Sequence, residues 1–154
     1  MALGKSRNGY RMEDVREIKA LIARQFASLS WPKGGTGNWS AFSSDFVDGA
    51  TLYPAARPLR AQDVSAFVAR MKSVAETELQ SLEESILGTK IIVFGNIAVA
   101  VTACAMRENE ITESRTVEML LLVKDGETWR IAAQAWDRAS DANPIPAQLL
   151  TNDT

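Results

Sequence analysis

The feature that most constrains the fold is a series of long apolar segments separated by tight turns in the second half of the chain. Gly95-Asn96 and Asp125-Gly126 are typical of turns between antiparallel strands, and a polar stretch over 108–113 forms a third break. Gly88 falls inside the first segment and predicts a bend there. The pattern predicts a meander of strands over residues 78–94, 97–107, 114–124 and 128–138.

Helical patterns precede these strands. Apolar residues recur at helical spacing over 12–31, where Trp31-Pro32 ends the helix, and again over 63–79, where Asp63 is the expected cap. A short helix capped by Asn38 and a strand over 48–54 lie between them. Helices followed by a meander indicate an α+β fold, with a curved antiparallel sheet wrapped around the N-terminal helices. The concave side of such a sheet is expected to enclose a ligand cavity.

The composition excludes several classes of function. The 154 residues favour one domain, with a core over 12–138 and flexible ends over 1–11 and 139–154. A net charge of −2 argues against nucleic-acid binding. No apolar run is long enough to span a membrane, and the N-terminal stretch lacks the pattern of a signal peptide. A cytoplasmic location is therefore expected.

The sequence contains no histidine. Catalysis by Ser-His-Asp or Cys-His groups within the chain is therefore excluded, as are the usual zinc sites. Acid–base chemistry would have to use carboxylates, tyrosine, lysine or water. Magnesium held by carboxylates stays open as an alternative, but the sequence has no clustered Asp/Glu motif for it, so we expect neither a metal site nor a cofactor. We interpret Cys104, the single cysteine, as a small buried hydrophobic residue.

The strand over 97–106 is apolar on both faces. A strand without a polar side is usually buried twice, and the helices cover only one face of the sheet. We therefore expect a homodimer that forms through the open sheet face. Trp136, which has the opposite parity to the inward set of its strand, is expected to face the partner.

The order of elements resembles the nuclear transport factor 2-like superfamily, a cone-shaped α+β fold that is also described as cystatin-like. The resemblance covers residues 12 to 138 and rests on a helix ending FASL, the stretch FSSDFVDGATLYP, a second helix, and strands closing with DGETWRIAAQAWD. The superfamily includes ketosteroid isomerases and SnoaL-like cyclases, dehydratases and epoxide hydrolases.

The resemblance implies a pocket but leaves the usual catalytic positions without their residues. Phe26 stands near the position of the isomerase tyrosine, and Tyr53-Pro54 stand where the base is expected. The late acid falls at Met119, with Glu118 beside it. A slip of one residue would turn the other face inward, so Glu118 stays open as a pocket residue.

Asp137 and Tyr53 are the candidate catalytic residues. If Trp129, Ile131, Ala133 and Ala135 face inward, Asp137 shares that face and a raised pKa would suit it as a base. Its alternative role is an ion pair with Arg115 or Arg138. Tyr53 would hold a ligand oxygen, or else pack with its hydroxyl in water.

The predicted ligand-binding residues are Trp39, Tyr53, Arg57, Phe67, Met71, Arg115 and Met119. Arg57 would clamp an anionic group, or else remain a solvated loop residue. Core packing alone would also explain the aromatic and methionine side chains. One of Glu83 and Glu84 would face inward, unless both lie at an exposed strand end.

Two functions follow from these patterns. The first is a protein that binds a small apolar or aromatic molecule, as a diverged cofactor-independent isomerase, cyclase or dehydratase that uses carboxylates. The second is a non-catalytic module for ligand sensing or dimerisation.

Overall fold

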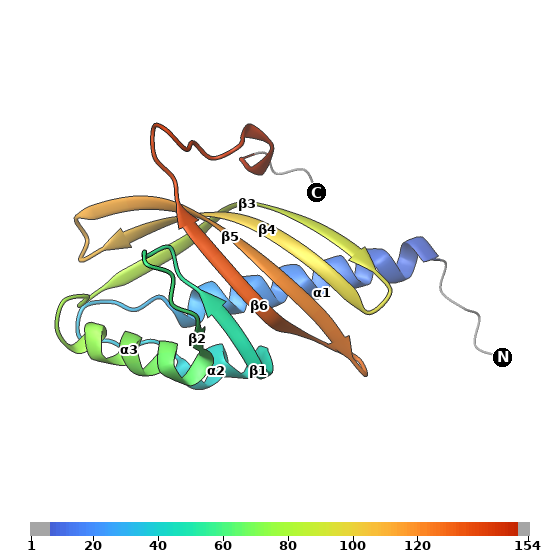
Figure 1. Cartoon of the computed structure of the whole chain (residues 1–154), viewed down its shortest axis with the longest axis horizontal. Coiled ribbons are helices and arrows are strands. Elements are labelled where there is room, and N and C mark those ends of the chain that lie inside the picture. Colours follow the sequence, from blue (N-terminus) through green and yellow to red (C-terminus); the bar gives the residue numbers. More distant parts are fainter. Residues whose placement is uncertain (1–6, 151–154) are drawn as a thin grey trace.

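The computed structural model describes residues 7–150, and its elements follow the predicted order (Figure 1). The helices and strands are α1 (Arg7–Ser28), α2 (Trp39–Ser44), β1 (Phe46–Tyr53), β2 (Gln62–Asp63), α3 (Val64–Glu76), β3 (Leu82–Phe94), β4 (Ile97–Glu108), β5 (Thr112–Asp125), β6 (Thr128–Arg138) and the 3-10 turn η1 (Ala147–Leu149). The two predicted caps are confirmed, because Asn38 accepts a hydrogen bond from Ala41 N and Asp63 accepts one from Ala66 N.

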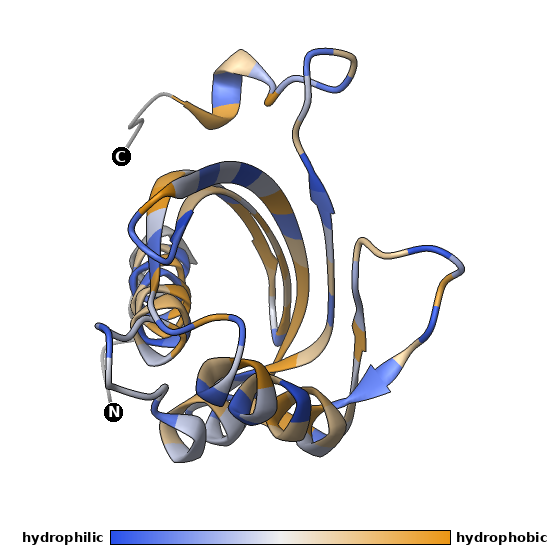
Figure 2. Cartoon of the chain, turned by 90° about the vertical axis from the view of Figure 1, so that its left-hand side faces the viewer, coloured by the Kyte–Doolittle hydropathy of each residue, from blue (hydrophilic) through white to orange (hydrophobic). Residues whose placement is uncertain are grey.

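The strands form one sheet in the order β2-β1-β6-β5-β4-β3. All neighbours are antiparallel except β1 and β6, a parallel pair that the sequence did not predict. The sheet arches over α1, and α2 and α3 lie beside the same concave side (Figure 2). The predicted α+β class with a curved sheet around the helices is confirmed.

Two of the antiparallel strand pairs contain a one-residue bulge. Leu87 is an extra residue in β3 relative to β4, next to the predicted bend at Gly88. Ala132 is an extra residue in β6 relative to β5. A bulge increases local twist and also moves the following side chains to the opposite face of the sheet.

Helix α1 supplies the largest share of the core under the arch. Its side chains Ile18, Leu21 and Ile22 are at most 1% exposed and belong to one cluster with Leu122 and Ile131 of the sheet. Burying apolar side chains of this size stabilises a fold by about 1.5–3 kcal/mol each. Core packing therefore fixes the position of α1 relative to β5 and β6.

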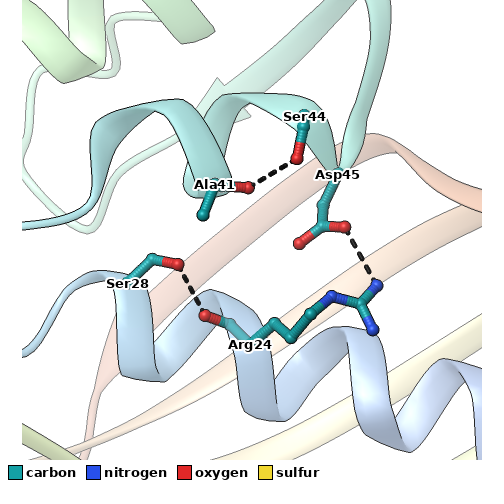
Figure 3. A network of polar contacts seen from close by, with 5 residues as sticks. All are labelled: Arg24, Ser28, Ala41, Ser44 and Asp45. Atoms are coloured by element: carbon teal, nitrogen blue, oxygen red, sulfur yellow. Dashed lines mark hydrogen bonds and ion pairs between the residues drawn. The ribbon is translucent and has the colours of Figure 1, made fainter.

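A polar network joins α1 to the start of β1 (Figure 3). Arg24 Nη2 lies 3.0 Å from Asp45 Oδ1, and Ser28 Oγ donates to the carbonyl of Arg24. The backbone carbonyl of Asp45 also accepts a 2.8 Å hydrogen bond from Ile131 N. Asp45 thus fixes the point where β1 begins alongside β6, and with it one wall of the concave side.

The chain after β6 crosses the convex face of the sheet (Figure 2). Leu149 is buried there, and an added Cβ at Gly88 would lie 1.8 Å from the carbonyl oxygen of Leu149. The remaining convex face keeps a group of exposed apolar side chains, namely Ile92, Phe94, Ile97, Val99, Met119 and Leu121. We call this group the outer apolar face.

None of the helices in residues 7–150 is both long enough and apolar enough to traverse a lipid bilayer.

Candidate functional site

A cavity of about 400 Å³ lies on the concave side, between the sheet and α3. We call it the inner cavity. Most of its wall is apolar and comes from Leu29, Phe42, Leu52, Phe67, Met71, Val74, Leu79, Leu82, Met106 and Trp136. The charged residues Arg70, Glu108, Asp137 and Arg138 contribute to its lining from exposed or half-buried positions. Apolar walls with few polar groups are typical of small-molecule sites.

Glu84 and Glu118 bring two carboxyl groups into this apolar cavity. Glu84 on β3 pairs with Met106 of β4, and Glu118 on β5 pairs with Thr102, which also belongs to β4. Both side chains are half-buried, but Oε2 of each is inaccessible to solvent and has no hydrogen-bond partner in the described part of the chain. Such unpaired oxygens are costly unless they are protonated or contact a ligand.

The pKa values of both carboxyl groups are raised. Burial raises the pKa of Glu118 to about 7, although the hydrogen bond from Gln134 acts in the opposite direction. Burial is also the larger reason that the pKa of Glu84 lies well above its ordinary value, and the negative charge of Glu118 adds to it. Two acids that interact in this way titrate as a pair, because the negative charge of one favours the protonated form of the other.

Gln134 connects Glu118 to helix α1. Its Nε2 donates to Glu118 Oε1 at 3.1 Å and to Gln25 Oε1 at 3.1 Å, while Gln25 Nε2 donates to Gln134 Oε1 at 2.7 Å. Gln25 and Gln134 are 1% and 4% exposed. A buried polar network with its partners in place holds its members in defined positions, so Glu118 has a fixed orientation in the cavity.

Cys104 lies near the acid pair but does not share its chemistry. Its Sγ is 2.7 Å from Thr116 Oγ1, and the side chain is buried, as predicted. Burial, with a contribution from the charge of Glu118, raises the pKa of the thiol to about 12. Cys104 is therefore a neutral thiol at physiological pH and a poor nucleophile.

Comparisons with known proteins identify the fold. No protein-family model matches the sequence, and no curated protein matches it significantly. A structure of a nuclear transport factor 2-like protein from Pseudomonas putida KT2440 superposes with a TM-score of 0.70 at 14% identity, covering 93% of this chain and 96% of that one. A "Putative Scytalone Dehydratase" from Novosphingobium aromaticivorans superposes at 0.68 with 13% identity, covering 88% and 95%. A "Putative Dehydratase" from Streptomyces avermitilis gives 0.68 at 8% identity, covering 84% and 99%.

The chain has the nuclear transport factor 2-like fold. The inner cavity is the hollow of this cone, which agrees with the resemblance in the sequence.

Only some of the predicted site residues line the cone. Phe67 and Met71 do so. Tyr53, Arg57 and Met119 lie instead on the other side of the sheet, in a hollow of about 700 Å³ between β1, β6 and the segment 143–149. We call this hollow the outer groove. The guanidinium of Arg57 is hydrogen-bonded to the carbonyls of its own loop at residues 54, 55 and 56.

The other two predicted ligand contacts lie apart from both hollows. Arg115 faces a third hollow beside residues 139–141, where its backbone carbonyl accepts a hydrogen bond from Ala139 N. Trp39 packs edge-to-face against Trp31 with ring centroids 5.6 Å apart, and its Nε1 donates to Thr36. In the nuclear transport factor 2-like cone, Trp39 thus supports the wall from outside the cavity.

The bulge at Ala132 corrects the expected orientation of the last strand. Trp129 and Ile131 are buried under the arch as predicted, but beyond the bulge the inward residues are Gln134 and Trp136. Ala135 lines the outer groove instead. The expectation that Trp136 faces a partner was wrong, because its ring packs edge-to-face on Phe67 at 5.8 Å.

Asp137 is displaced by the same bulge. It is exposed at the end of β6, contributes to the lining of both the inner cavity and the outer groove, and its Oδ1 accepts a hydrogen bond from Arg138 N. The acids that place a buried oxygen in the cavity are those left open in the sequence, Glu118 and Glu84. A glutamate within an otherwise apolar strand such as 117–123 is the signal that points to Glu118.

Proposed function

We propose that this protein binds a small, largely apolar molecule in the inner cavity and transfers protons with Glu84 and Glu118, as a cofactor-independent lyase or isomerase. The observation that carries the proposal is the pair of inward carboxyl groups in a mostly apolar cavity, each with a buried oxygen that has no hydrogen-bond partner within residues 7–150. A pKa near 7 suits Glu118 to accept and release protons at neutral pH.

The hydrogen-bonding groups around the pair favour a ligand that donates hydrogen bonds. Gln134 is engaged with Gln25 and Glu118, and Thr116 is engaged with Cys104. The oxygens Oε2 of Glu84, Oε2 of Glu118 and Oε1 of Gln62 are buried without a hydrogen-bond partner within residues 7–150 and line the cavity, so a ligand hydroxyl would donate to them. An aromatic or aliphatic body would fill the apolar remainder of the cavity.

A hydroxyl-bearing carbonyl compound allows a balanced reaction. Ionised Glu118 takes a proton from the carbon beside the carbonyl, and protonated Glu84 gives its proton to the hydroxyl group. The C–O bond breaks, a C=C bond forms and water leaves. The proton on Glu118 then returns to Glu84 by exchange within the pair. Two of the matched structures bear the name of a dehydratase, an enzyme that catalyses the loss of water.

The experiment uses the aldol adduct of acetone and benzaldehyde, an aromatic β-hydroxy ketone. Formation of the conjugated enone is followed by absorbance, and deuterium uptake beside the carbonyl is followed by NMR in heavy water. Glu118→Gln and Glu84→Gln are expected to lower both rates about 100-fold. Glu113→Gln, which alters an exposed ion pair with Arg107, is the matched control.

Rates that are unchanged in both variants would overturn the catalytic proposal. Binding of the ketone by wild type and by both variants, with no turnover in any of them, would favour the non-catalytic ligand-sensing alternative instead. Binding of the ketone and of benzyl alcohol is measured by tryptophan fluorescence. If neither compound binds, the proposal that the cavity takes small aromatic molecules with a hydroxyl group is contradicted.

We also propose that two copies associate through the outer apolar face. The support is the set of exposed aliphatic and aromatic side chains, in which Ile92 and Phe94 are 71% and 77% exposed. A contiguous apolar surface on a sheet is usually covered by a partner. The test is the mass of the wild-type protein in solution, measured by light scattering.

A further inference from the structure

We propose that Gln25 and Gln134 form a switchable pair of positioning residues, which offers Glu118 a donor when it is ionised and an acceptor when it is protonated. This inference rests on the proposed function only in treating Glu118 as a group that changes its protonation state. It concerns how the buried network around that group responds.

The two amides form a closed ring of two hydrogen bonds. Gln25 Nε2 donates to Gln134 Oε1 at 2.7 Å, and Gln134 Nε2 returns a hydrogen bond to Gln25 Oε1 at 3.1 Å. The second hydrogen on Gln134 Nε2 is directed to Glu118 Oε1. In this arrangement Glu118 receives a donor, which is the partner that an ionised carboxylate requires.

A protonated Glu118 requires a different partner when its proton lies on Oε1. If the Gln134 amide stayed as it is, its N–H would then face an O–H. Rotation of the amide by about 180° exchanges its oxygen and nitrogen, which have nearly the same size and position. Gln134 Oε1 would then accept the proton of Glu118.

The ring forces the two amides to rotate together. If Gln134 rotated alone, its oxygen would face the oxygen of Gln25 and its N–H group would face the N–H group of Gln25, in a site where both residues are almost fully buried. If both rotate, the ring of two hydrogen bonds forms again with donors and acceptors exchanged. A single buried amide could not rotate in this way, because its N–H or its carbonyl oxygen would lack a partner either when Glu118 is ionised or when it is protonated.

Within residues 7–150, Glu118 is the one charged or titratable group that is hydrogen-bonded to this ring. The negative charge of Glu118 acts on Glu84 of β3, which lines the same cavity, and on the thiol of Cys104 on β4. Arg70 on α3, Glu108 on β4, and Asp137 and Arg138 on β6 line the cavity. The hydrogen-bonded link from Glu118 to α1 runs through Gln134 and Gln25. Protonation at the cavity is therefore transmitted to the helix under the sheet.

The test is an NMR titration of the full-length protein without ligand, with labelled glutamine side-chain amides and labelled glutamate carboxyl carbons, from about pH 5 to about pH 9. The amide resonances of both Gln25 and Gln134 are expected to shift with the same midpoint as the carboxyl carbon of Glu118. In Glu118→Gln, which does not titrate at this position, both shifts should disappear. The exposed amide of Gln80 is the internal control.

Gln25 resonances that stay constant while Glu118 titrates would show that Gln134 is a fixed donor, and would overturn the proposal. Shifts that persist unchanged in Glu118→Gln would also overturn it. Because the titration uses no substrate, a failure to find turnover leaves this result intact. Conversely, fixed amides would leave the proposed binding and proton transfer in place.

Discussion

Gln134 Nε2 on β6 lies 3.1 Å from Glu118 Oε1 on β5, and this contact ties a carboxyl group of the cavity to a glutamine pair buried under the sheet. Replacing Gln134 by leucine removes the contact and also leaves the buried amide of Gln25 without its partner. We expect Gln134→Leu to lower the free energy of unfolding by about 1–3 kcal/mol, measured by urea denaturation.

The double variant Gln25→Leu/Gln134→Leu is the control for this first prediction. It replaces both partners by apolar groups, so part of the lost stability should return. A double variant that is less stable than Gln134→Leu by the full cost of a second substitution would contradict the interpretation.

The second prediction concerns pH. The pKa of Glu118 in the folded protein is about 7, above the ordinary value of 4.5, so between these values the folded state binds more protons than the unfolded state. The resulting stabilisation is fully present below about pH 4.5 and is lost as the pH rises through about 7. The loss amounts to at most ~3 kcal/mol. The raised pKa of Glu84 contributes with the same sign.

Glu118→Gln should therefore unfold with a weaker pH dependence over this interval and gain stability relative to wild type at pH 8. Urea denaturation at several pH values measures the effect. Glu113→Gln, at an exposed position, should keep the slope of wild type. An equal slope in wild type and Glu118→Gln would show that Glu118 titrates in the same range whether the chain is folded or unfolded.

The third prediction tests the packing of the C-terminal segment. A Cβ at Gly88 would overlap the carbonyl of Leu149, so Gly88→Ala should displace residues 147–150 from β3. We expect faster amide hydrogen exchange in this segment and a stability loss of about 1–2 kcal/mol. Ser85→Ala, at an exposed position of the same strand, is the control. Unchanged exchange at residues 147–150 would contradict the close contact.

The fourth prediction tests association through the outer apolar face. Light scattering of the wild type at micromolar concentration should give the mass of two chains. Leu121→Lys places a charge among the exposed apolar side chains and should give the mass of one chain. Lys72→Glu, on the exposed surface of α3, should leave the mass unchanged. A wild type with the mass of a single chain would exclude this proposal.

The elements with strong local signals could be predicted from the sequence. The turns at Gly95 and Gly126 adopt positive φ angles, and Asn38 and Asp63 cap their helices. These features depend on residues close to one another in the chain, so short-range preferences decide them. Gly88 marks the bend of β3 by a similar local signal, but the approach of Leu149 that this glycine permits is a long-range contact and could not be predicted.

The set of residues that face the inner cavity could not be predicted in the same way. It depends on a bulge at Ala132, which no glycine or proline marks. Without that bulge Asp137 would share the inward face with Trp129 and Ile131, as the sequence suggested. With it, Gln134 enters the cavity and binds Glu118. The parallel pairing of β1 with β6 is equally a matter of long-range contacts, among them the hydrogen bond between Ile131 and Asp45.

Ala132 is one extra residue in β6 relative to β5, so the side chains that follow it in β6 point to the opposite face of the sheet from the one they would otherwise occupy. The inner cavity and the outer groove are therefore lined by the two faces of the same strand. The number of residues in β6 before each position decides which of the two hollows that residue lines. Deletion of this one residue would turn the inward side chains of the following part of β6 outward and the outward ones inward. Relatives that differ at this position would have a different cavity lining even where the rest of the strand has the same sequence.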